Sequence, residues 1–214
     1  MIVLRNRPVL KSERRGGSSL NDVGILAYGS LIDCPGREID SVIVERKKDV
    51  QTPFKVEFAR CSSSRGGAPT LIPVVKGGAN VSAVILVLSG VSEEDAWDML
   101  WRRETNNVCT GGKYPKGARG ENAVYVERSP GFCDLDVVLH TKIEGNIPNL
   151  TPENLAVPAI RSVRCAGEGR DGITYLIRAK ENGIRTPLMP DYERAILGKL
   201  GADSLEDALR RLRS

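Results

Sequence analysis

Aromatic residues are scarce in this chain, and long apolar runs are missing. Only 5% of the 214 residues are aromatic, and none is interleaved with the basic clusters, so a base-stacking platform for nucleic acid is lacking. No apolar run approaches the roughly 20 residues that a membrane-spanning helix needs. The N-terminal segment has basic residues but no signal-peptide apolar core. We therefore expect no nucleic-acid partner, no membrane segment and a cytoplasmic location.

Histidine and paired cysteines are also rare. The chain has one histidine and five cysteines, without any Cys-x-x-Cys pair. An odd number of widely spaced cysteines argues against a zinc site or a disulfide framework, and it fits a reducing compartment. A Cys–His nucleophilic pair would have to use His140, whose strand-like surroundings at 137–140 are equally typical of a partly buried strand histidine.

The remaining composition is that of an ordinary globular protein. Hydrophobic residues make up 41% of the chain and charged residues 27%, with a net charge of +4. Much of the basic excess lies at the two ends, where it indicates solvated tails or, alternatively, a weak nucleic-acid contact. We expect a basic and flexible extension over 1–21, followed by a single domain over 22–214.

Apolar and alternating runs predict strands first and helices afterwards. The expected strands lie near Val23 and at 54–58, 71–75, 81–88, 123–126 and 136–142. The run 81–88 is apolar on both faces and should be central, whereas Pro73 should place its strand toward an edge. Helices are expected from Ser92, over 173–180, from Pro190 and from Ser204. This order predicts an α+β fold.

The first predicted strand ends on an unusual sequence. Tyr28-Gly29-Ser30-Leu31 directly follows the buried run at 24–27. A strand that stops on Gly-Ser can present backbone N–H groups and one hydroxyl in a small concavity, which suits a carboxylate. The alternative is a plain strand-to-turn connection.

The helix expected from Ser92 carries a carboxylate at its far end. Four of its residues share one face at helical spacing: Trp97, Leu100, Trp101 and Glu104. Glu104 therefore either pairs with an arginine at the helix end or points into a partly apolar pocket, where it could transfer protons. The neighbouring Arg102 and Arg103 can point elsewhere.

These residues carry a resemblance to a known family. Tyr28-Gly29-Ser30-Leu31 followed by Pro35-Gly36 resembles the opening motif of the γ-glutamylcyclotransferase superfamily, in particular its ChaC-like branch. Four later segments are similar to that branch in order and approximate spacing: the Arg-Gly-Pro region at 58–69, the Arg-Glu helix end at 100–104, Lys113-Tyr114, and the C-terminal helices at 155–209. The resemblance covers most of residues 22–210.

The resemblance implies a fold and an activity. The fold is a small mixed β-barrel-like sheet with flanking helices and a helical C-terminal segment. The activity is cleavage of a γ-glutamyl amide, such as glutathione or a γ-glutamyl amino acid or amine, by attack of the substrate's own α-amine on its γ-carbonyl. The products are 5-oxoproline and a free amine, and neither a cofactor nor a metal is needed.

The resemblance also assigns roles to residues. Glu104 matches the family's catalytic glutamate, which would act as general base and then as general acid. Gly29, Ser30 and Leu31 would bind the substrate's α-carboxylate. Tyr28 would pack on its methylenes or donate from its hydroxyl, and Tyr114 would lie at the pocket rim.

Two other classes of function stay open at this point. One is a non-catalytic small-molecule-binding or interaction domain on the same scaffold. The other is a cysteine amidase that uses Cys34, close in sequence to the Gly-Ser turn. The oligomeric state is open as well. The enzyme hypothesis requires that Ser30 and Glu104 face one pocket within hydrogen-bond reach of a substrate.

Overall fold

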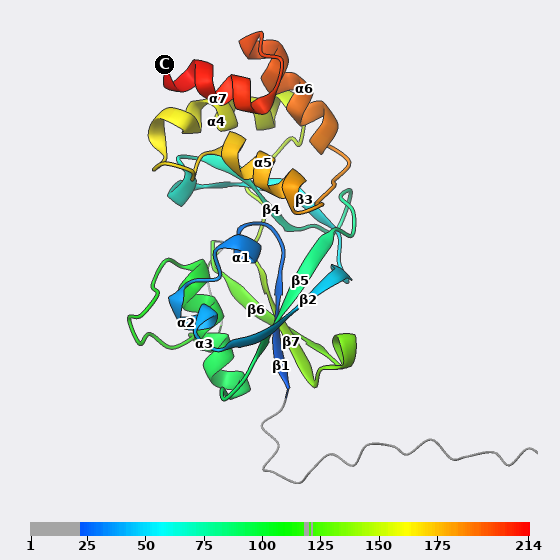
Figure 1. Cartoon of the computed structure of the whole chain (residues 1–214), viewed down its shortest axis with the longest axis vertical. Helices are drawn as coiled ribbons and strands as arrows, with labels where there is room; N and C mark the ends of the chain where they lie inside the picture. Colours follow the sequence, from blue (N-terminus) through cyan, green and yellow to red (C-terminus); the bar gives the residue numbers. More distant parts are fainter. Residues whose placement is uncertain (1–21, 118–119, 121) are drawn as a thin grey trace, which may run out of the picture.

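A five-stranded mixed sheet forms one half of the computed structural model, which describes residues 22–117, 120 and 122–214 (Figure 1). The strands are β1 Val23–Ala27, β2 Ile43–Gln51, β5 Ser82–Leu88, β6 Tyr125–Pro130 and β7 Val137–Lys142, in the order β2-β5-β1-β7-β6. β1 pairs antiparallel with β5 and parallel with β7. The prediction that 81–88 lies inside a sheet is therefore confirmed.

A second sheet has only two strands, β3 Val56–Ser62 and β4 Ala68–Pro73. They are joined by the short 3-10 helix η1 Ser63–Arg65, so the loop expected over 61–69 is shorter than predicted. Within the described residues the two sheets do not close into a barrel, because β3 and β4 pair with each other and β2 and β6 remain edge strands. The expected barrel-like sheet is thus corrected to two separate sheets in an α+β fold.

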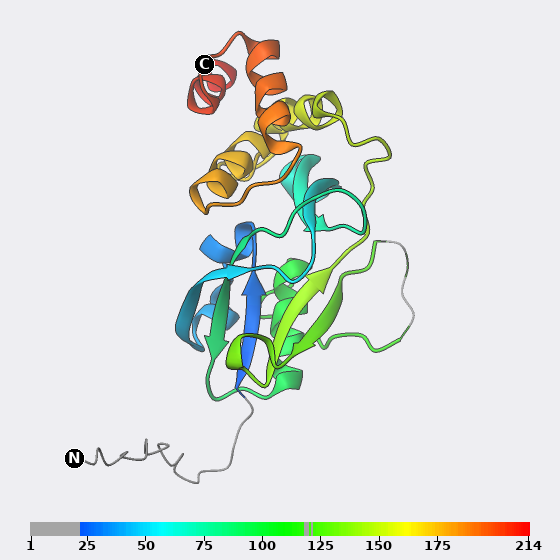
Figure 2. The same ribbon diagram turned by 90° about the vertical axis from the view of Figure 1, so that its right-hand side faces the viewer.

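Four helices cover the two-stranded sheet (Figures 1 and 2). They are α4 Pro152–Cys165, α5 Gly172–Glu181, α6 Met189–Leu200 and α7 Leu205–Arg213. Their apolar faces meet β3 and β4 in one core, in which Phe58, Leu176 and Tyr192 are almost fully buried. The helical C-terminal segment is therefore confirmed, including the N-cap at Ser204, whose hydroxyl accepts from the Asp207 N–H.

The helix α3 Glu93–Glu104 packs on the five-stranded sheet, where Leu100 lies buried. Its start is the predicted one, since the Ser92 hydroxyl accepts a hydrogen bond from the Asp95 N–H at 3.1 Å. Beside it lie two short helices, α1 Ser30–Asp33 and α2 Arg37–Asp40. α3 ends at Glu104, on the side of the sheet that faces the helical half.

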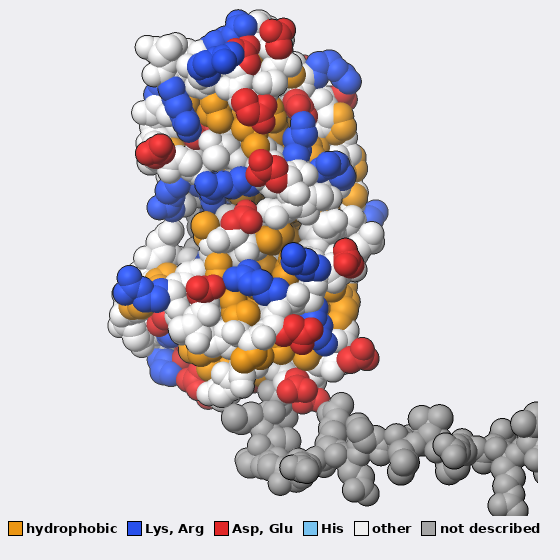
Figure 3. All heavy atoms as spheres, in the orientation of Figure 1, with side chains coloured by type: hydrophobic (Ala, Val, Ile, Leu, Met, Phe, Trp, Pro, Cys, Tyr) orange, Lys and Arg blue, Asp and Glu red, His pale blue; other side chains and the backbone are white. Residues whose placement is uncertain are grey.

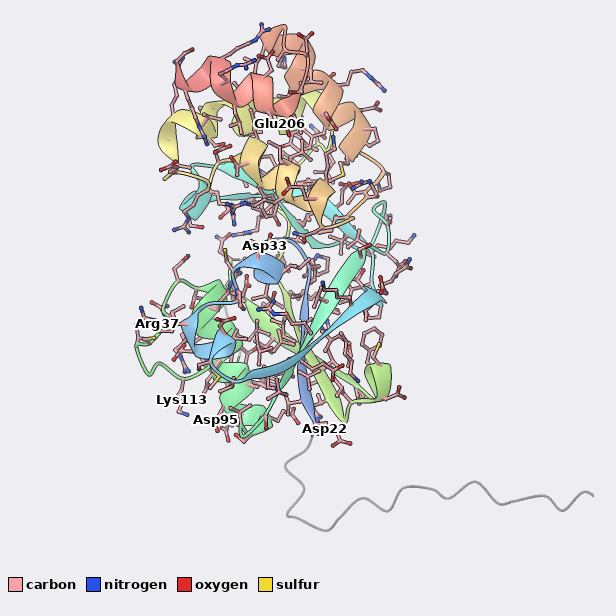
Figure 4. All side chains as sticks on the ribbon, viewed as in Figure 1. Asp22, Asp33, Arg37, Asp95, Lys113 and Glu206 are labelled. Carbon is pink, nitrogen blue, oxygen red and sulfur yellow. The ribbon has the colours of Figure 1, made fainter. Side chains whose placement is uncertain are left out.

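Asp33 of α1 lies just below α5 in Figure 4 and contributes one contact between the two halves. Its carboxylate accepts from the Asn182 side-chain amide at 2.9 Å. None of the described helices combines the length and apolar character needed to cross a lipid bilayer. The extension expected over 1–21 lies outside the described residues.

Candidate active site

A cavity of about 460 Å³ lies between the two halves of the molecule. The five-stranded half supplies the end of β1, the start of α1 and the end of α3. The other half supplies β3, η1, β4 and α5. Pockets of this size commonly hold small molecules.

The cavity collects most of the residues that the sequence singles out. Tyr28, Ser30, Leu31 and Glu104 all line it. Gly29 joins Tyr28 to Ser30 with a φ of 71° and a ψ of −138°, a conformation that only glycine adopts readily. The strand end and the helix end, distant in sequence, therefore meet at one cavity.

Tyr114 lies elsewhere. Its ring packs edge-on against Trp97, with centroids 5.1 Å apart, and its hydroxyl accepts from the Val126 N–H at 3.2 Å. Its own N–H donates to the Asp98 carboxylate at 2.7 Å. These contacts hold Tyr114 against α3 and β6, away from the cavity rim where it was expected.

Arg103 connects the two predicted parts of the site. Its Nη1 is 2.5 Å from Glu104 Oε1, and its Nη2 donates to Ser30 Oγ at 3.1 Å. The same guanidinium donates to the Cys34 carbonyl at 2.8 Å. The Glu104 side chain is still 25% exposed in the cavity. The arginine pair of the first interpretation is thus present, and Glu104 also lines the cavity, as the second interpretation requires, while its proton transfer stays a prediction.

The neighbouring arginine behaves as expected. Arg102 turns away from the cavity, with its Nε 3.0 Å from a Glu38 carboxylate oxygen and its Nη1 2.6 Å from the Gly112 carbonyl. Of the two arginines that can point elsewhere, Arg102 does so and Arg103 does not. The reason is steric: Arg103 lies on the side of α3 that faces α1, beside Gly36, whose missing side chain leaves it room.

Two tyrosines flank Glu104. The Tyr28 hydroxyl donates to the Thr141 carbonyl at 3.0 Å, so its proton is already engaged. Burial raises the pKa of Tyr28 well above its usual value, and the nearby charge of Glu104 raises it further. Burial likewise raises the pKa of Tyr175, on which the charge of Glu104 also acts. Both phenols therefore stay neutral at physiological pH.

Tyr175 is a site residue that the sequence did not reveal. It lies on α5, lines the cavity, and its hydroxyl accepts from the Leu71 N–H at 3.4 Å. A side chain at Gly29 would overlap this hydroxyl. The hydroxyl thus fills the space left by Gly29, a contact between two halves of the fold that no local motif encodes.

The Cys–His alternative has no geometric support. His140 lies in β7 beside Thr141, which lines the cavity, but His140 itself does not line it, and its ring packs against Phe54 with the centroids 4.6 Å apart. Burial lowers its pKa. Cys34 does line the cavity, but His140 is the single histidine of the chain, so this cysteine has no imidazole beside it.

Positive charge dominates the cavity wall. Five arginines line it: Arg60, Arg65, Arg103, Arg170 and Arg178. Glu104 is the one carboxylate among its described lining residues. On the face seen in Figure 3, a group of Lys and Arg side chains lies at the level of α5, just above α1. The cavity therefore suits an anionic ligand.

Over residues 22–117, 120 and 122–214, no group of three or more His, Cys, Asp or Glu side chains is arranged to hold a metal ion. No protein-family model matches this sequence, and no curated protein matches it.

Proposed function

We propose that this chain is a γ-glutamylcyclotransferase-like enzyme. Its substrate would be a γ-glutamyl amide, which it would cleave to 5-oxoproline and a free amine. The observation that carries the proposal is that one guanidinium, that of Arg103, bonds both Ser30 and Glu104 at the edge of a single cavity. The sequence resemblance supplies the reaction, and this arrangement supports it.

The glutamyl end of the substrate would bind near the Gly-Ser turn. The N–H groups of Ser30 and Leu31 lie in the first turn of α1, where they have no acceptor within the helix. They are therefore available to an anion. Arg103 adds a positive charge at the same place. The α-carboxylate of the substrate would accept from these donors, which places its α-amine toward Glu104.

Proton transfer would then fall to Glu104. The carboxylate takes a proton from the α-ammonium group, and the freed amine attacks the γ-carbonyl carbon to form a five-membered ring. When the bond to the leaving nitrogen breaks, Glu104 returns the proton to that nitrogen. It then takes the second proton that the ring nitrogen carries after the attack and passes it to the freed amine, which leaves as an ammonium group. The carboxylate ends as it began, and no water is consumed. Because the attack is intramolecular, the main task of the protein is to hold the chain curled.

A panel of amides tests this proposal. The purified chain is incubated with glutathione, γ-glutamyl-alanine and γ-glutamyl-ethylamine, and 5-oxoproline and the freed amine are quantified together by mass spectrometry. We expect equal amounts of the two products from at least one compound. The isomer α-glutamyl-alanine is the control, because it has no γ-amide and should release no alanine.

The other outcomes separate the competing classes. A hydrolytic amidase would release glutamate and incorporate oxygen from isotope-labelled water. A binding domain would bind the panel compounds in calorimetry without releasing either product. The tight pairing of Arg103 with Glu104 is the observation that favours this second function.

A further inference from the structure

The strongest feature outside the proposed chemistry is a cluster of guanidinium groups on the upper wall of the cavity. Arg65 ends η1, Arg170 lies in the turn before α5, and Arg178 lies on α5. All three line the cavity. They belong to the helical half, whereas Ser30, Arg103 and Glu104 belong to the five-stranded half.

Arg65 holds the centre of this cluster. Its guanidinium lies over the Tyr175 ring, 4.5 Å from the centroid, and its Nη1 donates to the Arg170 carbonyl at 3.3 Å. Burial lowers the pKa of Arg65, and the charges of Arg103, Arg170 and Arg178 lower it further. The three other positive charges are therefore close enough to act on Arg65.

The cluster lacks matching negative charge. Among the described residues, no ion pair joins Arg65, Arg170 or Arg178 to a carboxylate, and the Arg170 guanidinium donates instead to the Asn106 amide oxygen at 3.5 Å. By contrast, Arg102, Arg128 and Arg213 each pair with an acid outside the cavity. Glu104 offsets one charge of the four. Like charges gathered in a cavity repel one another, and an anionic ligand relieves that repulsion.

The charge balance points to the part of the substrate that must supply the anion. The glutamyl end of a γ-glutamyl amide carries one ammonium and one carboxylate, so it adds no net charge. The amine that leaves is the part that can reach the upper wall once the glutamyl end occupies the Gly-Ser turn. Guanidinium groups bind carboxylates through paired hydrogen bonds, which favours an acidic leaving group.

We infer that Arg65, Arg170 and Arg178 form a subsite for an acidic leaving group, and that the preferred substrates are γ-glutamyl amides of amines bearing two carboxylates. Acidic amino acids and acidic peptides are such amines. This inference rests on the proposed function, because it assumes that the glutamyl end lies at Ser30 and Glu104.

A charge series of nearly equal shape tests the subsite. The compounds are γ-glutamyl-glutamate, γ-glutamyl-glutamine and γ-glutamyl-glutamine amide, whose leaving groups carry two, one and no carboxylates. We expect kcat/KM for 5-oxoproline release to fall about tenfold at each step. Equal values across the series would overturn the inference while leaving the proposed function standing.

Two matched variants locate the effect. Arg178 and Arg37 are both exposed, and neither pairs with a described carboxylate, but Arg37 lies on α2 at the outer side of the molecule (Figure 4). Arg178→Gln should lower kcat/KM for γ-glutamyl-glutamate about tenfold. It should change kcat/KM for γ-glutamyl-glutamine amide less than about twofold. Arg37→Gln should change neither. An equal loss on all three compounds in Arg178→Gln would contradict an anion subsite.

A binding measurement tests the subsite independently of the proposed enzymatic function. If no compound yields 5-oxoproline, the proposed function fails, and calorimetry of the wild-type chain then decides on the subsite. Tighter binding of γ-glutamyl-glutamate than of γ-glutamyl-glutamine, lost in Arg178→Gln, would support it. Equal affinities, or no binding of either compound, would overturn it.

Discussion

Glu104→Gln should lower kcat for 5-oxoproline release by about 10²- to 10⁴-fold, because the amide cannot accept the proton that the attacking amine must lose. Glutamine has almost the same shape, and its carbonyl oxygen can still accept from Arg103, so the cavity should keep its form. Substrate affinity should change little. The measurement is kcat and KM for the best compound of the amide panel, with thermal unfolding to verify the fold.

A second glutamate provides the matched control. Glu38 also pairs with an arginine of α3, Arg102, but it lies outside the cavity. Glu38→Gln therefore removes the same kind of ion pair without touching the site, and it should retain most of the activity. Wild-type turnover by Glu104→Gln would show that the assigned role is wrong. Equal losses of activity in both variants would show that the effect comes from breaking an ion pair with α3.

Gly29→Ala should destabilise the protein by about 3 kcal/mol, since it combines backbone strain with overpacking. The φ of 71° and ψ of −138° disfavour any residue with a side chain. The new methyl group would also overlap the Tyr175 hydroxyl, and this ring is buried against Phe58 and beneath Arg65. The free energy of unfolding from urea titration measures the loss whether or not the protein is an enzyme.

Two further variants separate the two causes. Gly90 has a φ of 74°, and a methyl group there would meet nothing within 4 Å. Gly90→Ala should therefore lose only about 1 kcal/mol from backbone strain. Adding Tyr175→Phe to Gly29→Ala should restore part of the stability, because it removes the overlapping oxygen. If Gly29→Ala were no worse than Gly90→Ala, the close contact with Tyr175 would not matter.

The elements with clear apolar patterns or caps were predictable, and the others were not. β5 and α3 follow from a two-sided apolar run and from the cap at Ser92. β2 was missed because Glu45, Lys47 and their neighbours are charged, as suits an exposed edge strand. The helix α4 was missed because Pro158 inside it is untypical of a helix interior, although the family resemblance covered this segment.

The site divides in the same way. Glu104 could be placed from helical spacing alone, since the buried Leu100 and the half-buried Trp101 mark the face of α3 that packs on the sheet. Tyr175 and Arg178 could not, because α5 reaches the cavity only through packing between distant segments. The position of Tyr114 depends on the course of the loop after α3. The hydrogen bond from the Tyr114 N–H to the Asp98 carboxylate holds this loop against the helix. Side chains on loops and across interfaces are set by such contacts rather than by local pattern.

The division of the cavity between the two halves has a consequence for how such an enzyme could be re-engineered. The groups assigned to the chemistry stand on the turn after β1, on α1 and on α3, while the groups assigned to the leaving amine stand on η1, on α5 and in the turn before α5. Substitutions in the second set would change which amides are accepted while the proton-transfer machinery stays intact. Selectivity and reactivity would then be separately adjustable in one small protein.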